Sequence, residues 1–231
     1  METLILDYSK YNPSLKDKIK DSFAKPLFKV NHEVVKTLMF KQDYKDYKLV
    51  KPSLEHLKLD KEKLRVFYPG CGSDLTNLLL VLELLSKKSK SINLILNDIL
   101  LNPQSLTKAF QKITGVNTYK KEKQTDNYNK NIFSFKNKIV ELDLFENDIF
   151  KSIPTKLEKG FDIYFERGFR IMRNTRPAFL AIVLQHLNKK GLVITDALFE
   201  ENYAKLLGLE RVKGLPTKFG LYKEFAVYKK P

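Results

Sequence analysis

The sequence predicts an α/β fold: a seven-stranded, mostly parallel sheet with helices on both faces, an antiparallel C-terminal hairpin and a helical N-terminal extension. Three observations predict it. Short apolar runs alternate with helical patterns from residue 64 onward, as in chains whose parallel strands are connected by helices. The run 75–85 is apolar on all sides, which is typical of a helix buried against a sheet. Two strand-like segments near the C-terminus follow each other without a helix between them.

Length and composition fit one such domain. The chain has 231 residues, of which 43% are hydrophobic, enough for one packed core. We expect a helical extension over residues 1–63 and the sheet domain over residues 64–231. Within the extension, apolar side chains recur at helical spacing in two stripes: Leu15, Ile19 and Phe23, and then Val34, Val35, Leu38 and Met39.

The sheet domain alternates strands and helices. Strands are expected at residues 64–68, 92–97, 139–142, 161–165 and 192–195. Helices are expected at residues 75–85, 103–113 and 177–187. Two further strands, at 210–213 and 221–228, are joined by Gly-Leu-Pro-Thr-Lys-Phe-Gly. Because no helix connects this last pair, the two strands can only be antiparallel.

Residues 116–131 are polar and show no period, which predicts an insertion or a long loop before the third strand. The segment interleaves Tyr119 and Tyr128 with lysines, a composition that could stack and grip a single-stranded nucleic acid. A solvated loop is the simpler interpretation of the same composition.

The formal net charge is +15, with 42 Lys and Arg against 27 Asp and Glu. The lysines are spread among acidic residues along the whole chain, so most of this charge is interpreted as solvated surface and not as a phosphate-binding track. No run approaches the roughly 20 apolar residues of a membrane helix. The N-terminus lacks a basic region followed by an apolar signal core, so we expect a cytoplasmic protein without membrane contact.

The only cysteine, Cys71, excludes an intrachain disulfide and is interpreted as a small buried residue, because no neighbouring histidine could activate it. The three histidines are scattered along the sequence and have no second cysteine to join them. We therefore expect no metal site.

A glycine turn follows the first strand, in Val-Phe-Tyr-Pro-Gly-Cys-Gly-Ser-Asp (66–74). Gly70 and Gly72 let the backbone approach a ligand, and the helix that follows points free N–H groups at it. A dinucleotide site would need a third glycine where the chain has Leu75. The turn resembles motif I of the class I S-adenosylmethionine-dependent methyltransferases, with Tyr68 at the family's acidic position and Asp74 at its last glycine.

The resemblance covers about residues 64–230, and the reversed hairpin resembles the sixth and seventh strands of that family. It implies S-adenosylmethionine as cofactor. Asp98, directly after the second strand, would accept the two ribose hydroxyls, because a carboxylate offers two acceptor oxygens. Asp143 would accept a hydrogen bond from the adenine amino group; Glu141 could serve instead, or the backbone N–H of Leu144 could donate to the adenine. The expected cofactor-binding residues are Tyr68, Pro69, Gly70, Cys71, Gly72, Asp74, Asn97, Asp98, Ile99, Asp143 and Leu144.

An arginine-rich run follows the fourth strand and is expected to form mostly a loop before the helix at Pro177. It holds Arg167, Arg170, Arg173 and Arg176, four of the chain's six arginines. Arginine is suited to bidentate capture of carboxylate or phosphate, so Arg167 and Arg170 are candidates for holding an anionic methyl acceptor. Structural ion pairs with acidic residues would give the same pattern. Glu166, at the end of the strand, is the candidate base or orienting group.

The sequence therefore predicts an S-adenosylmethionine-dependent methyltransferase, with a small anionic acceptor favoured over RNA. The alternative is a catalytically silent protein that keeps the methyltransferase fold as a scaffold or as a nucleic-acid-binding module. Tyr68 and Asp74 support that alternative, because they replace residues with which the family holds its cofactor.

Overall fold

The computed structural model describes residues 26–57, 59, 61–117, 119–125, 127–151, 155–212 and 224–231. The helical stripe predicted at Leu15, Ile19 and Phe23 lies outside the described residues. So do residues 221–223, with which the last strand was expected to begin.

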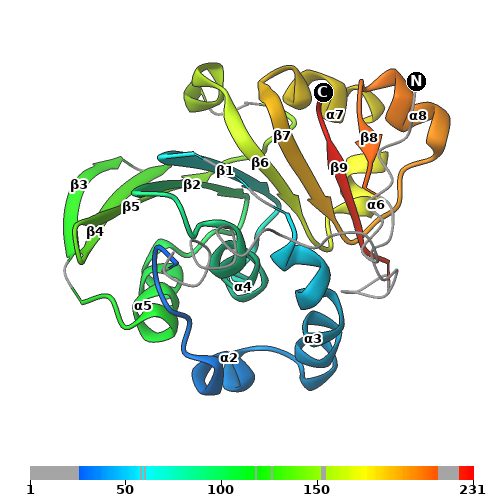
Figure 1. Cartoon of the computed structure of the whole chain (residues 1–231). Helices are drawn as coiled ribbons and strands as arrows, with labels where there is room; N and C mark the ends of the chain where they lie inside the picture. Colours follow the sequence, from blue (N-terminus) through cyan, green and yellow to red (C-terminus); the bar gives the residue numbers. More distant parts are fainter. Residues whose placement is uncertain are drawn as a thin grey trace.

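A single mixed sheet forms the centre of the molecule, which confirms the predicted fold class (Figure 1). Its order is β3-β4-β5-β2-β1-β6-β7-β9-β8. The five parallel strands of the middle are β1 (Lys63–Pro69), β2 (Ser91–Asp98), β5 (Lys138–Glu146), β6 (Phe161–Glu166) and β7 (Leu187–Thr195). The chain order reverses at β1, which pairs with β2 on one side and with β6 on the other.

Helices cover both faces of this sheet (Figure 1). They are α2 (His32–Leu38), α3 (Lys41–Glu55), α4 (Thr76–Leu85), α5 (Pro103–Thr114), α6 (Arg170–Asn174), α7 (Pro177–Gln185) and α8 (Glu201–Leu206), with a 3-10 turn η1 (Thr155–Lys159). Side chains alternate along each buried strand. In β1, Val66 and Tyr68 join the core formed with α2 to α5, whereas Phe67 joins the core formed with α7 and α8.

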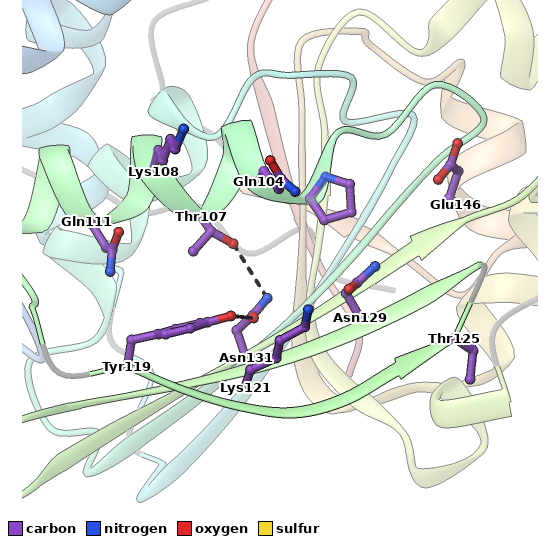
Figure 2. A pocket seen from close by; sticks show the side chains of 11 residues that line it. Gln104, Thr107, Lys108, Gln111, Tyr119, Lys121, Thr125, Asn129, Asn131 and Glu146 are labelled. Atoms are coloured by element: carbon purple, nitrogen blue, oxygen red, sulfur yellow. Dashed lines mark hydrogen bonds between the residues drawn. The ribbon is translucent and has the colours of Figure 1, made fainter.

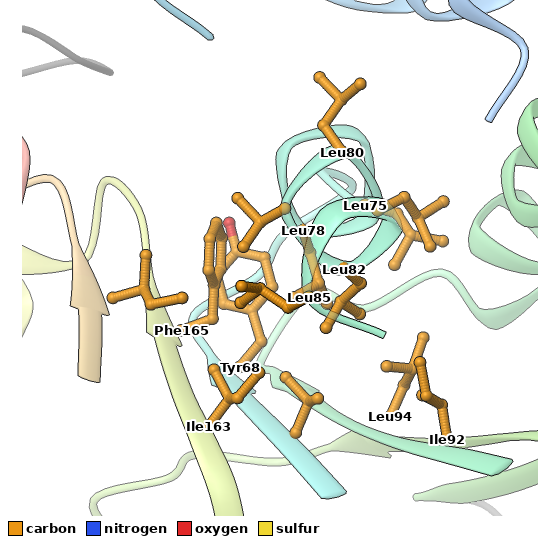
Figure 3. Close-up of a cluster of buried hydrophobic side chains, with 14 of the residues drawn as sticks. Tyr68, Leu75, Leu78, Leu80, Leu82, Leu85, Ile92, Leu94, Ile163 and Phe165 are labelled. Carbon is orange, nitrogen blue, oxygen red and sulfur yellow. The ribbon is translucent and has the colours of Figure 1, made fainter. Parts of the chain in front are cut away.

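Helix α4 is the centre of the first core. Nine of its ten residues are buried, as its apolar sequence predicts. Leu78, Leu82 and Leu85 lie above the strand side chains (Figure 3). The described part of the N-terminal extension joins the same core through Tyr47 and Val50 of α3.

The C-terminal hairpin is antiparallel, as predicted. It consists of β8 (Glu210–Arg211) and β9 (Ala226–Lys229), and β9 lies between β7 and β8 in the sheet.

The polar segment predicted at 116–131 as an insertion or a long loop is an insertion before the third strand and not a long loop, because residues 119–125 and 128–131 belong to a second hairpin. The sheet therefore has nine strands instead of seven (Figure 1). Strand β3 (Tyr119–Thr125) pairs with β4 (Tyr128–Phe135), and β4 extends the sheet along β5. Backbone hydrogen bonds to the edge of β5 hold these polar residues in a strand. Strand β4 is anchored in the core by Phe133, whose ring centre lies 4.5 Å from that of Phe110 in α5.

Helix α5 has clear signals at both ends. The side chain of Asn102 accepts a hydrogen bond from the Ser105 N–H at 3.0 Å, and Pro103 occupies the first turn. Gly115 ends the helix in the left-handed conformation, with φ of 65°. The Asn102 cap fixes where α5 begins and so where the loop that follows β2 ends.

Candidate functional site

A pocket of about 200 Å³ lies beyond the carboxyl ends of β1, β2 and β5, where the chain order reverses. Open α/β sheets bind ligands at this kind of position. Its lining includes Gly70 from the glycine turn, Asp98 at the end of β2, Ile149 after β5, and Phe169 and Met172 beyond β6.

The two glycines of the turn have a backbone conformation that favours glycine. Gly70 has φ of +59° and Gly72 has φ of +52°. They differ in their surroundings. A Cβ added at Gly70 would lie 2.1 Å from Cδ2 of Phe169, whereas a Cβ at Gly72 would meet no atom of the described residues within 4 Å. The close approach at Gly70 is thus to a protein ring, and the space at Gly72 is open.

Asp98 connects the second strand to the glycine turn. One carboxylate oxygen accepts the Gly72 N–H at 2.8 Å, and the other accepts the Leu100 N–H at 2.9 Å. The side chain is half-buried and lines the pocket beside Ile99. Each carboxylate oxygen has a second lone pair, so Asp98 keeps two acceptor positions for a ligand.

Asn97, also predicted, joins the ends of β2 and β5. Its Nδ2 donates to the Phe145 carbonyl at 3.2 Å and to the Asn147 side chain. Its buried Oδ1 has no hydrogen-bond partner among the described residues, and Asn97 lines the pocket. A buried amide oxygen without a partner is unusual and is available to a donor.

Five residues at and around the glycine turn that were predicted to bind the cofactor do not line this pocket: Tyr68, Pro69, Cys71, Gly72 and Asp74. The ring of Tyr68 is buried against Phe165 at 4.9 Å, and burial raises the pKa of its hydroxyl. Cys71 is buried, as predicted from its position between the glycines, and burial raises the pKa of its thiol as well. Asp74 accepts hydrogen bonds from the Thr76 N–H at 3.1 Å and from Arg167 at 3.0 Å. Pro69 is buried at the end of β1.

Strand β5 is longer than predicted, and Asp143 and Leu144, which were expected to contact the cofactor, do not line the pocket. Both lie inside the strand and are buried. The carboxylate of Asp143 accepts hydrogen bonds from Asn93 Nδ2 and from the Tyr128 hydroxyl, both at 2.5 Å. Tyr128 is half-buried, and its ring packs on that of Phe145, with ring centres 4.7 Å apart.

The pocket instead receives the residues that follow β5: Asn147, Asp148, Ile149 and Phe150. The sequence analysis missed them because it ended the third strand at residue 142. The signal that could have found them is the Asn-Asp pair at 147–148, the first turn-forming residues after the apolar run.

Two arginines of the run, Arg167 and Arg170, form ion pairs with acidic side chains, which is the structural alternative to capture of an external anion. Arg167 binds Asp74, with Nη1 and Oδ2 3.0 Å apart, and also Asp43 of α3. Arg170 lies 3.3 Å from Glu224. The run is also not mostly loop, because α6 begins at Arg170. The structural alternative therefore describes these side chains better than capture of an external anion.

Glu166, the predicted base or orienting group, is also bound by other side chains of the protein. It is 1% exposed and accepts hydrogen bonds from the Tyr164 hydroxyl at 2.8 Å and from Thr195 Oγ1 at 3.2 Å, and it binds Arg173 at 3.0 Å. It does not line the pocket. A carboxylate with these partners is not placed to accept a proton from a ligand in this structure.

Asp196, which follows β7, is an acidic residue that the sequence analysis missed. It is 1% exposed, and its Oδ2 accepts the Gly168 N–H at 2.9 Å. Its Oδ1 has no hydrogen-bond partner among the described residues. Burial raises the pKa of its carboxyl to about 6, against a lowering by the Gly168 N–H. Nothing in its local sequence distinguishes it from a surface aspartate.

None of the described helices has the length and apolar character needed to cross a membrane. In the same part of the chain, no group of three His, Cys, Asp or Glu side chains is placed to hold a metal ion.

No protein-family model and no curated protein sequence matches the chain. Solved structures do. A methyltransferase from Pyrococcus furiosus is 13% identical, with 81% of this chain and 82% of that chain covered and a TM-score of 0.44. The N-methyltransferase NodS from Bradyrhizobium japonicum, in complex with S-adenosylhomocysteine, is 13% identical, with 81% and 86% covered and a TM-score of 0.41.

Sp1610 from Streptococcus pneumoniae, a putative tRNA (m1A22) methyltransferase, is 10% identical, with 83% of this chain and 70% of that chain covered and a TM-score of 0.41. Likeness at this level carries no argument about activity or acceptor. The fold therefore rests on the strand order and pairing described above. With β9 reversed between β7 and β8, the chain has a mixed α/β fold that resembles the class I methyltransferases.

Proposed function

We propose that this protein binds S-adenosylmethionine at the glycine turn and transfers its methyl group to an acceptor. The observation that carries the proposal is the contact between Asp98 and Gly72. A half-buried carboxylate oxygen accepts the Gly72 N–H at 2.8 Å, at the point where the strand order reverses, and two acceptor positions of this carboxylate meet no donor from the described residues.

The described residues suggest how the cofactor would be held. The open backbone at Gly72 would lie beside its methionine part, and Asp98 would accept the ribose hydroxyls. Residues 147–149 would contact the adenine, in place of Asp143 and Leu144. The cofactor supplies a methyl group already activated by its sulfonium, so the protein needs chiefly to position the acceptor and exclude water.

Phe169 limits the space for such a ligand. The pocket of about 200 Å³ is smaller than the roughly 300–1,000 Å³ of typical small-molecule sites. The Phe169 ring lies over Gly70 and stacks on Phe150, with ring centres 5.8 Å apart. Binding therefore requires Phe169 to move away from Gly70.

The nature of the acceptor is a separate part of the proposal. The small anionic acceptor predicted from the sequence depended on Arg167 and Arg170, and both guanidiniums are engaged by acidic side chains. RNA, the other predicted acceptor, would draw on the net charge of +15. The ion pairs thus remove the reason for preferring the small anion.

A second candidate function is a catalytically silent scaffold. Two observations favour it: Phe169 fills the space over Gly70, and Glu166 is fully engaged by protein groups. A protein of this kind would keep the fold and bind no cofactor.

Calorimetric titration with S-adenosylhomocysteine and with NAD separates the two candidates. We expect micromolar or tighter binding of S-adenosylhomocysteine and none of NAD, because Leu75 stands where a pyrophosphate site needs glycine. Phe169→Leu should tighten binding by making room over Gly70. Phe179→Leu is the matched control, since Phe179 packs in the same cluster, 5.7 Å from Phe169, without lining the pocket. If neither the natural protein nor Phe169→Leu binds S-adenosylhomocysteine, the scaffold is the correct function.

A further inference from the structure

A larger groove lies between helix α5 and the hairpin of β3 and β4, on elements separate from the glycine turn (Figure 2). Its volume is about 760 Å³, against about 200 Å³ for the pocket at Gly70. The two share no lining residue. A groove of this size is sufficient for a small ligand.

One wall is the polar face of α5. Gln104, Thr107, Lys108 and Gln111 are spaced three or four residues apart and so share one side of the helix. The buried residues of the helix, among them Phe110, lie in the core. The helix thus presents amide, hydroxyl and ammonium groups to the groove.

The floor is the hairpin, and Asn131 is its centre. Asn131 is 3% exposed. Its Oδ1 accepts the Tyr119 hydroxyl at 2.7 Å, and its Nδ2 donates to Thr107 Oγ1 at 3.5 Å (Figure 2). The Tyr119 ring also packs on Phe133, with centres 5.6 Å apart. Tyr119 is therefore held at two points and is still 42% exposed.

The hairpin separates its charges between its faces. On the face away from the groove, Glu122 binds Lys120 at 3.7 Å and Lys130 at 2.9 Å. Lys121 lines the groove and forms no ion pair within the part of the chain that the structure describes. Lys108, across the groove, likewise has none there. The groove therefore carries the positive charges of Lys108 and Lys121, which no acidic side chain of the described residues pairs with.

We propose that this groove binds a nucleotide, either free or within a single strand. A base would stack on the exposed ring of Tyr119. The amides of Asn129 and Gln111 offer donors and acceptors to base edges. Lys121 is two residues along the strand, about 6.6 Å from Tyr119, which suits contact with the phosphate of the same nucleotide.

Glu146 sets the direction of the ligand. It lines the groove at the end away from Tyr119 (Figure 2). Its negative charge would repel a phosphate, so the phosphate belongs near the lysines. The proposal goes beyond methyl transfer and does not depend on cofactor binding, because none of these residues lines the pocket at Gly70.

Fluorescence anisotropy with a labelled hexaribonucleotide of mixed sequence, without S-adenosylhomocysteine, tests the proposal, and AMP serves as competitor. We expect Tyr119→Leu to weaken binding roughly tenfold through loss of stacking. Lys121→Ala should weaken it and lower the log–log salt slope by about one. The matched control is Lys120→Ala, which removes the same charge from the adjacent residue on the other face and should bind as the natural protein does.

Competition by AMP at equal concentration would identify a free nucleotide as the ligand, and binding of the hexamer alone would identify a single strand. Either result supports the site. Absence of binding would overturn it. So would equal weakening by Lys120→Ala and Lys121→Ala, because general surface charge would then explain the binding. Thermal melts of each variant show that the fold is kept, and the exposed Lys121 keeps the test valid if Tyr119→Leu does not fold.

Discussion

Arg173 Nε lies 3.0 Å from Glu166 Oε2, and both side chains are buried beneath the carboxyl ends of β6 and β7. The Arg173 guanidinium also lies over the Phe199 ring, 4.9 Å from its centre. An acid predicted to serve chemistry is thus the partner of a structural arginine.

Loss of the arginine from this buried pair should strongly destabilise the fold. Arg173→Met should lower the free energy of unfolding by about 3–5 kcal/mol, because Glu166 would remain buried without a counter-charge. Glu166→Gln combined with Arg173→Met should recover part of this loss. Urea unfolding of the two single variants and the double variant measures it. Arg176→Met, at an exposed arginine of the same run, should change stability by no more than about 0.5 kcal/mol. A loss at Arg173 no larger than at Arg176 would contradict the buried pair.

The two glycines of the turn should differ when each is replaced by alanine. Both have positive φ, so each substitution carries a backbone cost of about 1 kcal/mol. Gly70→Ala also forces its Cβ against Phe169, whereas Gly72→Ala meets open space. Thermal melts should therefore show Gly70→Ala as clearly less stable than Gly72→Ala. The difference between the two should shrink in a Phe169→Leu background, and a constant difference would exclude the ring as its cause.

Substitutions of Asp98 and Asp74, two acids at the glycine turn, should differ in their effect on cofactor affinity. Asp98→Asn replaces one acceptor oxygen by a donor and should weaken S-adenosylhomocysteine binding by on the order of 1–3 kcal/mol. Asp74→Asn should lower the melting temperature, because Asp74 binds Arg167 and the start of α4, and should leave the affinity nearly unchanged. Calorimetry and a thermal melt on each variant measure both properties. A similar loss of affinity in both variants would contradict a separate role for Asp98.

Asp196 predicts a dependence of stability on pH. Burial raises its pKa in the folded state to about 6, above the value of 3.8 for an exposed carboxyl. The folded state therefore binds more protons between these values, and the unfolding free energy falls as pH rises through about 4 to 6 and is then constant. Two pK units correspond to on the order of 3 kcal/mol.

Asp196→Asn should remove this fall. The variant should be more stable than the natural protein at pH 8, and the advantage should disappear near pH 4. Denaturation curves across this range measure the difference. Glu200→Gln, at an exposed acid, is the control and should show no such trend. An advantage that is the same at pH 4 and pH 8 would show that the Asp196 pKa is not raised.

The sequence by itself determined the parallel strands, the buried helix α4, the glycine turn and the reversed C-terminal strands. These features follow from local signals. An apolar run such as that of α4 must be buried wherever the chain places it, and two glycines with positive φ leave few alternatives to a turn. Asp98 could be singled out because the end of its strand was clear in the sequence, and it lines the pocket; its contact with a cofactor stays a prediction.

Only the tertiary structure decided which polar side chains are used by the protein itself. Arg167 binds Asp43, which is 124 residues away, and Arg170 binds Glu224, which is 54 residues away. No local pattern encodes such partners. The polar hairpin likewise becomes two strands because β5 offers an edge of unpaired backbone groups, and the groove exists only because α5 lies over that hairpin. The periodicity of apolar residues indicates which face a segment buries. An ion pair or the pairing of an edge strand depends on a distant segment, about which local periodicity gives no information.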